Sequence, residues 1–194
     1  MSLELVRHIP LLKALVFKLW LWDARSKLRR IERYLRKNEK IIDIGSGSGS
    51  VTLLLRESGC DVTPVDVRNL TLTDEARPRI YNGVRLPFDD GEFDVALILT
   101  VLHHARDPER VLLEAKRVAR RMVVIEDIYT TALQKYLTYF ADSLVNLEFF
   151  EHLHNNKTDE GWRELFKRLG LELVDAQYKS FLGFFAQAGY FLKW

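Results

Sequence analysis

The glycine-rich segment Asp43-Ile-Gly45-Ser46-Gly47-Ser-Gly49 carries the clearest chemical signal in this sequence. It follows an apolar pair at 41–42 and leads into a second apolar run at 51–55, so that a strand ends in a turn that opens a helix. Glycine permits the unusual dihedral angles of such a turn and lets bare backbone approach a ligand. A helix N-terminus beside the turn favours anionic or polar groups. We therefore expect a ligand site here.

The spacing of the glycines selects among nucleotide-type ligands. A dinucleotide-binding turn has the pattern Gly-x-Gly-x-x-Gly, which requires a glycine or alanine at Ser50, counted from Gly45, or at Thr52, counted from Gly47. Neither position fits. The dinucleotide pattern is therefore absent, although the strand–turn–helix arrangement is kept.

Asp66 is the second residue with a chemical role in this arrangement. It follows the apolar stretch 61–65, about twenty residues after the glycine turn, where a nucleotide fold places a carboxylate against ribose. An ionised carboxylate only accepts hydrogen bonds and can bind both hydroxyls of an unphosphorylated ribose. We interpret Asp66 as a ribose ligand, with a simple turn or cap role as the alternative.

Alternating strand and helix signals position these residues. Strands are predicted at 40–44, 61–65, 79–81, 93–100, 122–126, 171–175 and 184–192, and helices at 51–58, 107–119 and 159–169. Pro108 suits a first helical position, and Gly170 suits a helix end. Residues 128–150 indicate a helical insertion rich in aromatic side chains. This alternation is typical of an α/β protein with a mostly parallel sheet covered on both faces.

The N-terminal segment differs in composition from the rest. Residues 1–40 contain eleven Lys or Arg against four Asp or Glu, although the whole chain has a net charge of only +2. Residues 10–22 are almost wholly apolar but too short to span a bilayer. We expect one helix there and a second one from an Asp23 cap to about Lys37.

Length and cysteine content limit the class of protein. With 194 residues, 47% of them apolar, the chain suits one well-cored domain, which we place at 39–194 after an N-terminal helical segment at 1–38. The single Cys60 excludes an internal disulfide framework and a cysteine-based zinc site. No convincing signal peptide is present, so that a cytoplasmic protein is expected.

The segment Leu86-Pro-Phe-Asp-Asp-Gly-Glu-Phe-Asp94 extends the pattern towards one family. Together with the acidic-x-Gly-x-Gly-x-Gly turn, Val101-Leu-His103-His104 and Glu114-Ala-x-Arg117-Val, it resembles class I S-adenosylmethionine (SAM)-dependent methyltransferases of the small-molecule, type 11-like group. The similarity runs from about residue 39 to 127. It implies a three-layer Rossmann-like sandwich with a seven-stranded, mostly parallel sheet and an antiparallel last strand. The segment between Asp66 and Leu86 is shorter than in the family, which predicts that its helix is reduced to a loop.

The resemblance assigns cofactor contacts position by position. SAM would be the methyl donor and S-adenosylhomocysteine the product. The residues implied as its contacts are Asp43, Gly45, Ser46, Gly47, Gly49, Asp66, Val67, Asn82, Gly83, Leu99 and Thr100. The ribose would lie at Asp66, the adenine at Val67 and Asn82, and the methionine part near the glycine turn and Thr100. For Asn82-Gly83 an ordinary turn is an equal alternative.

Methyl transfer requires that the acceptor atom be held in line with the methyl group of the donor, and a protonated acceptor also requires a base. His103 and His104 follow the strand at 93–100, and Glu126 ends the strand at 122–126, so all three are candidate bases at the ligand-binding edge of the sheet. Local packing or hydrogen bonding is the alternative for each. His152-x-His154 lacks a further fixed ligand, and we predict no metal site.

Several acceptors and partners stay open. DNA is not expected, because the Asp/Asn-Pro-Pro-aromatic motif of amino-directed enzymes is replaced by Thr100-Val-Leu-His103 and Cys60 precedes the wrong strand for a C5 enzyme. A small, apolar acceptor is favoured over RNA or protein, which would depend on the basic helix with Arg25 to Lys37. A non-catalytic partner protein that keeps the fold is the other class. The N-terminal helix could form a lid, a homodimer surface or a peripheral membrane contact.

Overall fold

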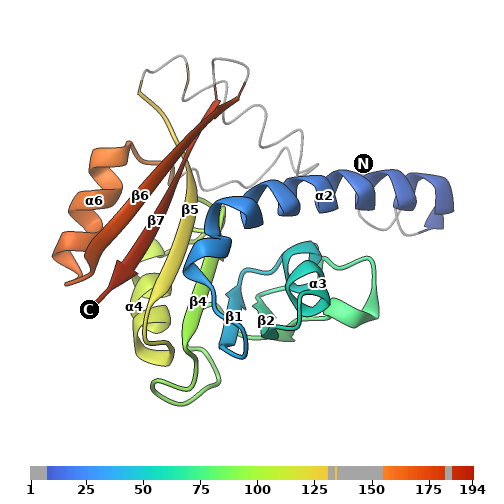
Figure 1. The fold of residues 1–194 in the computed structure, drawn as a ribbon, viewed down its shortest axis with the longest axis horizontal. Coiled ribbons are helices and arrows are strands. Elements are labelled where there is room, and N and C mark those ends of the chain that lie inside the picture. The colour runs from blue at the N-terminus through green and yellow to red at the C-terminus, as the bar shows by residue number, and fades with distance from the viewer. Residues whose placement is uncertain (1–7, 131–133, 135–154, 182–184) are drawn as a thin grey trace.

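A seven-stranded sheet with helices on both faces forms the body of the protein in the computed structural model (Figure 1). The structure describes residues 8–130, 134, 155–181 and 185–194. The strands are β1 (Lys40–Ile44), β2 (Asp61–Asp66), β3 (Arg79–Ile80), β4 (Val95–Leu99), β5 (Met122–Ile128), β6 (Glu172–Phe181) and β7 (Phe185–Lys193). Their order across the sheet is β3-β2-β1-β4-β5-β7-β6.

The register of the sheet confirms the predicted parallel arrangement. Strands β3, β2, β1, β4 and β5 pair in parallel, whereas β7 runs antiparallel to both β5 and β6. The carboxyl ends of β1, β2, β4 and β5 therefore lie along one edge, where α/β sheets bind ligands. The order reverses between β1 and β4, which places the topological switch beside the glycine turn.

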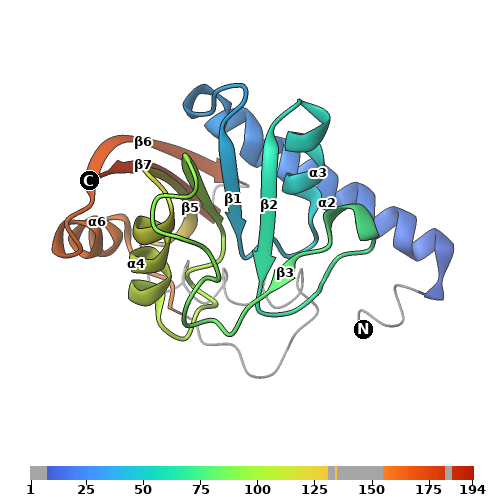
Figure 2. The ribbon, with the colours of Figure 1, turned by 90° about the horizontal axis from the view of Figure 1, so that it is seen from below.

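Helices cover both faces of the sheet, as Figures 1 and 2 show from two directions, and two clusters of apolar side chains hold them there. On one face, α2 (Pro10–Ile31) and α3 (Ser50–Glu57) contribute Ile31 and Leu55 to a cluster with strand residues such as Leu97. On the other face, α4 (Pro108–Val118) and α6 (Asp159–Arg168) contribute Leu112 and Trp162 to a larger cluster. The result is the predicted three-layer sandwich.

The N-terminal region departs from the prediction of two helices. A single helix, α2, runs without a break over Pro10–Ile31 and is followed by a short 3-10 helix, η1 (Glu32–Tyr34). The prediction that Asp23 caps a second helix is therefore wrong. Asp23 lies inside α2 and forms an ion pair of 2.7 Å with Lys27, one turn later. A helix continues there because no proline or glycine interrupts 11–31 and an (i, i+4) pair of this kind stabilises it.

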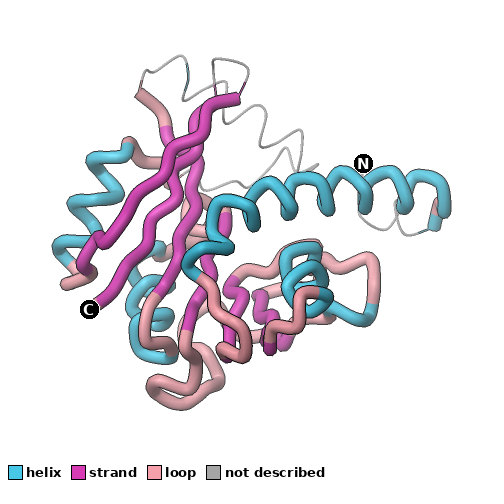
Figure 3. Tube along the Cα trace, viewed as in Figure 1, coloured by secondary structure: helices cyan, strands magenta, loops and turns pink. Residues whose placement is uncertain are grey.

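The segment between β2 and β3 confirms the prediction of a reduced helix. It holds only a 3-10 helix, η2 (Asp74–Ala76), before the two residues of β3. The tube view in Figure 3 shows this segment mainly as loop. The helical insertion predicted at 128–150 lies largely outside the described residues. Within the described part of the chain, no helix combines the length and apolarity needed to cross a membrane.

Candidate functional site at the carboxyl edge of the sheet

The three glycines of the turn after β1 have different neighbours. All have positive φ angles, of 71° at Gly45, 51° at Gly47 and 75° at Gly49. A Cβ on Gly45 would lie 2.6 Å from the Val101 side chain, and one on Gly49 would lie 2.5 Å from Ala76 Cβ. At Gly47 the nearest atom would be 3.9 Å away. Two glycines thus allow close packing of the turn, whereas Gly47 leaves open space on its exposed side.

The Asp66 carboxylate lies directly beside this turn. Its Oδ2 accepts a hydrogen bond of 2.8 Å from the Gly47 amide, and its Oδ1 accepts one of 3.2 Å from the Arg68 amide. Asp66 is 7% exposed. A carboxylate has about four acceptor positions, so that two are left for a ligand. The structure therefore joins the two strongest sequence predictions, the glycine turn and Asp66, in one place.

Val67 and Gly83 meet next to Asp66. A Cβ on Gly83 would lie 3.3 Å from Val67 Cγ1, and Val67 keeps 54% of its surface exposed. Asn82 uses its side-chain oxygen in a turn, accepting from the amides of Val84 and Arg85 at 2.9 and 3.1 Å. The apolar Val67 side chain is thus available to a ligand, whereas the Asn82 oxygen already has two donors.

Asp43 is buried beneath the turn rather than lining it. It is 2% exposed, and its Oδ2 accepts a 2.7 Å hydrogen bond from the Thr52 hydroxyl of α3. Burial raises the pKa of Asp43 to about 6, and the Thr52 hydrogen bond opposes that rise. Ser46 is also buried, and its hydroxyl oxygen has no hydrogen-bond partner among the described residues. Asp43 thus supports the turn from below. The Ser46 hydroxyl in the turn remains available for a hydrogen bond to a ligand.

The end of β4 brings a residue from α2 into the site. Thr100, directly after Leu99, has a φ of 60°, a conformation that β-branched residues rarely adopt. Its hydroxyl accepts a 2.9 Å hydrogen bond from Lys27 Nζ and donates to the Leu99 carbonyl at 2.6 Å. The Lys27 side chain is only 12% exposed. The sequence alone does not distinguish Lys27 from the solvated cations of the same basic helix.

Two of the candidate bases form a buried pair with each other. Glu126 is 0% exposed and His103 is 1% exposed, and Glu126 Oε2 lies 2.6 Å from His103 Nδ1. Glu126 Oε1 also accepts hydrogen bonds from the Val101 and Leu102 amides at 2.8 and 2.7 Å. Glu126 thus holds the loop after β4 through three donors. These contacts favour a positioning role for both side chains.

His104 and Asp127 extend from this pair in different directions. The His104 ring centroid lies 3.9 Å from that of His103, and His104 is partly exposed, so that it is the most accessible of the three candidate bases. Asp127 follows Glu126 in β5 and points to the α2 face, where it bonds Gln187. Burial raises the pKa of Asp127, and the electrostatic interaction with the nearby His103 opposes that rise.

A charged clamp on α4 holds the segment from Leu86 to Asp94. Arg117 donates to the Leu86 and Phe88 carbonyls at 2.9 and 2.8 Å, and Glu114 accepts from the Leu86 amide at 2.8 Å. The Arg117 guanidinium, through its hydrogen bond, holds the pKa of Glu114 below its usual value. The paired sequence motifs at 86–94 and 114–118 therefore serve one structural purpose, the placement of the loop that leads into β4.

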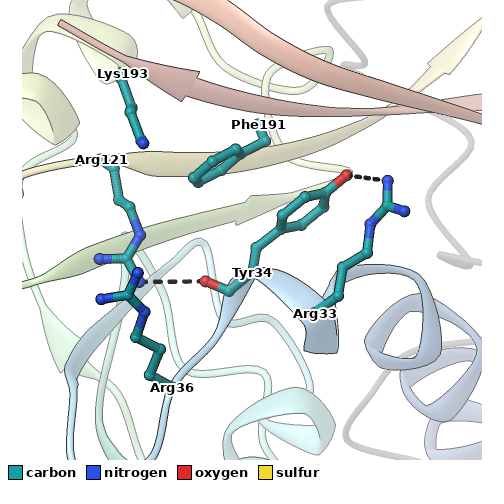
Figure 4. Close-up of a pocket in the computed structure, with 6 residues that line it drawn as sticks. All are labelled: Arg33, Tyr34, Arg36, Arg121, Phe191 and Lys193. Atoms are coloured by element: carbon teal, nitrogen blue, oxygen red, sulfur yellow. Dashed lines mark hydrogen bonds between the residues drawn. The ribbon is translucent and has the colours of Figure 1, made fainter.

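A separate cavity of about 340 Å³ lies at the opposite edge of the sheet (Figure 4). Its lining residues are Arg33, Tyr34, Arg36, Arg121, Phe191 and Lys193. The Tyr34 and Phe191 rings stack with centroids 4.7 Å apart. These residues precede β1 and β5 or end β7, so that the cavity contains none of the predicted site residues. Two arginines of the basic N-terminal segment therefore point away from the carboxyl edge.

Among the residues that the structure describes, no group of three or more His, Cys, Asp or Glu side chains could hold a metal ion. His152 and His154 lie outside the described residues.

Comparisons with known proteins agree with this geometry. The sequence model of a family described as "Methyltransferase domain" matches residues 42–125. Demethylmenaquinone methyltransferase from Beutenbergia cavernae is 28% identical over 144 residues, which cover 64% of this chain and 60% of that protein. The chain spans about half the length of the curated relatives that it matches, with 47% and 51% coverage of two others.

Solved structures show the same fold at low sequence identity. A SAM-dependent methyltransferase from Methanosarcina mazei superposes with a TM-score of 0.66 at 21% identity, covering 84% of this chain and 96% of that one. Magnesium protoporphyrin IX methyltransferase from Synechocystis, solved with bound S-adenosylhomocysteine, gives a TM-score of 0.64 at 15% identity, covering 90% and 83%. These likenesses establish the fold and leave the acceptor open.

Proposed function

We propose that this chain, which carries a methyltransferase domain of the class I SAM-dependent family, transfers a methyl group from SAM to a small-molecule acceptor. The observation that carries the proposal is the contact between Asp66 and the Gly47 amide, because it combines a carboxylate with a glycine that leaves open space. Small-molecule methyltransferases among the relatives, such as the demethylmenaquinone enzyme, support this acceptor class.

The residues at the carboxyl edge fit SAM in three respects. Asp66 keeps acceptor positions for ribose hydroxyls, and exposed Val67 offers apolar surface to the adenine. The buried Ser46 hydroxyl lacks a partner among the described residues and could bond the methionine part. Lys27 of α2, which contacts Thr100 just after β4, would pair with the methionine carboxylate. When bound, SAM supplies an activated methyl group on a sulfonium centre.

The chain itself would provide orientation and, for protonated acceptors, a base. Glu126 and His103 fix the loop after β4, so that Leu99 and Thr100 keep their place at the donor. His104 is the residue we propose to accept an acceptor proton, because it is the partly exposed member of the histidine pair. A His104→Gln variant should lower kcat with little change in SAM affinity and should alter the pH profile of kcat; an unchanged profile would remove His104 from this role.

The alternative functions are weaker at specific points. A partner protein that binds no SAM would not need the remaining acceptor positions of the Asp66 carboxylate. Of the cations on which an RNA acceptor would depend, Arg33 and Arg36 line a cavity at the opposite edge of the sheet and so lie away from the proposed donor site. Protein acceptors stay open as a second acceptor class.

Calorimetric titration with SAM and S-adenosylhomocysteine tests the cofactor proposal. The wild-type chain should bind both ligands. Asp66→Ala should lose at least about tenfold in affinity, because a charged hydrogen bond to a ligand contributes about 1.5–3 kcal/mol. Asp61→Ala, an exposed carboxylate on the same strand, is the matched control and should bind normally. If the wild-type chain bound neither SAM nor S-adenosylhomocysteine, the proposal that it is a methyltransferase would be rejected.

The glycines offer a second test that separates ligand contact from packing. Gly49→Ala should lower the free energy of unfolding, because its Cβ would overlap Ala76. Gly47→Ala carries only the cost of its positive φ, about 1–2 kcal/mol, yet would occupy the ligand side. We expect Gly47→Ala to reduce SAM affinity more than it reduces stability, as measured by titration and urea unfolding.

A further inference from the structure

Helix α2 carries a surface for which neither the sheet nor the ligand site accounts. Four large apolar side chains on it are exposed: Leu11 by 83%, Leu15 by 56%, Leu19 by 58% and Trp22 by 63%. Their spacing of four, four and three residues places them on one helical face. Elsewhere exposed apolar side chains such as Leu113 on α4, at 48%, are scattered, which is normal for a protein surface.

Cations continue the same face. Lys18, Arg25 and Arg29 are exposed: Lys18 precedes Trp22 by four residues, Arg25 follows Trp22 by three, and Arg29 follows Arg25 by four. The only acidic residue in α2 is Asp23, and it is already paired with Lys27. We call the surface formed by these seven exposed residues the α2 face, namely Leu11, Leu15, Lys18, Leu19, Trp22, Arg25 and Arg29.

The placement of α2 makes this face accessible to a large, flat partner. Figures 1 and 2 both show the N-terminal part of α2 projecting beyond the strands. The C-terminal part is anchored, with Ala24, Ser26 and Ile31 buried against the body. A projecting helix end that exposes leucine and tryptophan side chains beside cations offers the residue types that bind the membrane interface and anionic headgroups.

From these observations we propose that the α2 face binds the surface of an anionic phospholipid membrane. The apolar side chains would enter the boundary between headgroups and acyl chains, where tryptophan is favoured. The three cations would attract anionic headgroups. A second copy of this chain fits less well, because symmetric pairing would bring these cations together with no unpaired carboxylate on α2 to neutralise them.

The surface also has a defined relation to the ligand site. Lys27 lies on the same helix and reaches Thr100 at the end of β4. Lys27 lies five residues after Trp22, on the side of the helix opposite to the α2 face, so a membrane-bound α2 would lie between the bilayer and the carboxyl edge and hold them about one helix diameter apart, about 10–12 Å. Acceptors dissolved in the bilayer would then be presented near that edge. The binding itself depends only on the α2 face and not on methyl transfer.

Co-sedimentation of the full chain with vesicles tests the proposal. Vesicles of phosphatidylcholine mixed with phosphatidylglycerol should bind the protein at low salt, and vesicles of phosphatidylcholine alone should bind it far less. Raising the salt concentration should weaken binding because screening reduces the headgroup attraction. Absence of binding to the anionic vesicles at low salt would overturn the proposal.

Matched variants separate the two contributions of the α2 face. The triple variant Leu15→Ser, Leu19→Ser, Trp22→Ser should lose about tenfold or more in partitioning to anionic vesicles. Arg25→Gln with Arg29→Gln should lose about fivefold for each cation removed. Leu113→Ser, an exposed leucine away from α2, is the control and should bind as the wild type. Equal binding by the triple variant and the wild type would refute the assignment to this face.

Two further measurements keep folding and self-association apart from lipid binding. Urea midpoints and SAM titration should be unchanged in all these variants, because the substituted side chains are exposed. Sedimentation equilibrium distinguishes the occupants. A wild-type dimer that the triple variant abolishes, without vesicle binding, would show that a second copy covers the face and would overturn the membrane proposal.

Discussion

Two buried carboxylates lie on opposite sides of the proposed donor site and are held in different ways. Glu126, at the end of β5, has no exposed surface and accepts hydrogen bonds from two amides and His103. Asp43, at the end of β1, is 2% exposed and accepts one side-chain hydrogen bond, from Thr52. Three donors compensate a buried charge much better than one. The β5 carboxylate thus stabilises the loop that carries His104, whereas the β1 carboxylate carries a desolvation cost at neutral pH.

The largest expected effect is on the well-compensated side. Glu126→Gln keeps one oxygen as an acceptor but replaces the other with an NH2 group, which would face either two backbone N–H groups or His103 without an acceptor. We therefore expect a loss of about 3–5 kcal/mol in the free energy of unfolding. Urea denaturation measures it. Glu109→Gln on exposed α4 surface should change little. If Glu126→Gln lowered the free energy of unfolding no more than Glu109→Gln does, the conclusion that Glu126 is the better compensated carboxylate would be wrong.

The pH dependence of stability tests the poorly compensated side. Because the folded pKa of Asp43 is raised to about 6, its proton binds more tightly in the folded state, and this contribution is lost as pH rises through about 4 to 6. Asp43→Asn cannot ionise, so its stability relative to wild type should improve by about 3 kcal/mol between about pH 4 and pH 8. Urea midpoints at several pH values, with Asp61→Asn as control, measure the difference. A constant difference would show that Asp43 has an ordinary pKa.

Removing the single donor of Asp43 should sharpen the comparison. Thr52→Val keeps the shape of this buried side chain but deletes its hydroxyl, and we expect a loss of about 1–3 kcal/mol near neutral pH. The midpoint of the Asp43 titration should also rise, because a hydrogen bond that favours the ionised form is gone. Thr52→Ser retains the donor and should restore both properties. The same pH profile for both variants would contradict the role of this hydrogen bond.

Substitution of Lys27, the cation near Asp43, should have the smallest effect of the variants that test the two carboxylates. Lys27→Met removes a cation that favours the ionised form of Asp43 and the proposed partner of the methionine carboxylate. We expect SAM affinity to fall about fivefold to tenfold, which corresponds to about 1 kcal/mol. Lys18→Met, exposed on the same helix, is the control for titration calorimetry. Identical affinities would exclude Lys27 from the ligand site.

The meeting of the glycine turn with Asp66 could be predicted from sequence because its signals are local. The turn at 43–49 and the carboxylate at Asp66 each follow an apolar strand, and their meeting follows from parallel pairing of β1 and β2. The buried pair of His103 and Glu126 could not be predicted, because it depends on how β4 aligns with β5, where Leu99 lies opposite Ile125. Register between strands is set by tertiary packing, which no short segment encodes.

The N-terminal region shows a second limit of sequence reasoning. Aspartate is a preferred residue type at the N-cap of a helix, but an aspartate four residues before a lysine, as Asp23 is before Lys27, equally suits a helix interior. The continuous helix carries Lys27 to Thr100, a contact that joins residues 73 positions apart. Local propensity described each helical turn correctly but could not decide between one helix and two.

The position of β7 has a consequence for the order in which the chain can fold during synthesis. Strand β7 follows β6 in sequence but lies between β5 and β6 in the sheet. A ribosome therefore releases β6 before the strand that connects it to the sheet exists. Until residues 185–193 emerge, β5 keeps an unpaired edge and β6 has no neighbour. Nascent chains stopped before residue 185 should accordingly be prone to aggregation and to capture by chaperones.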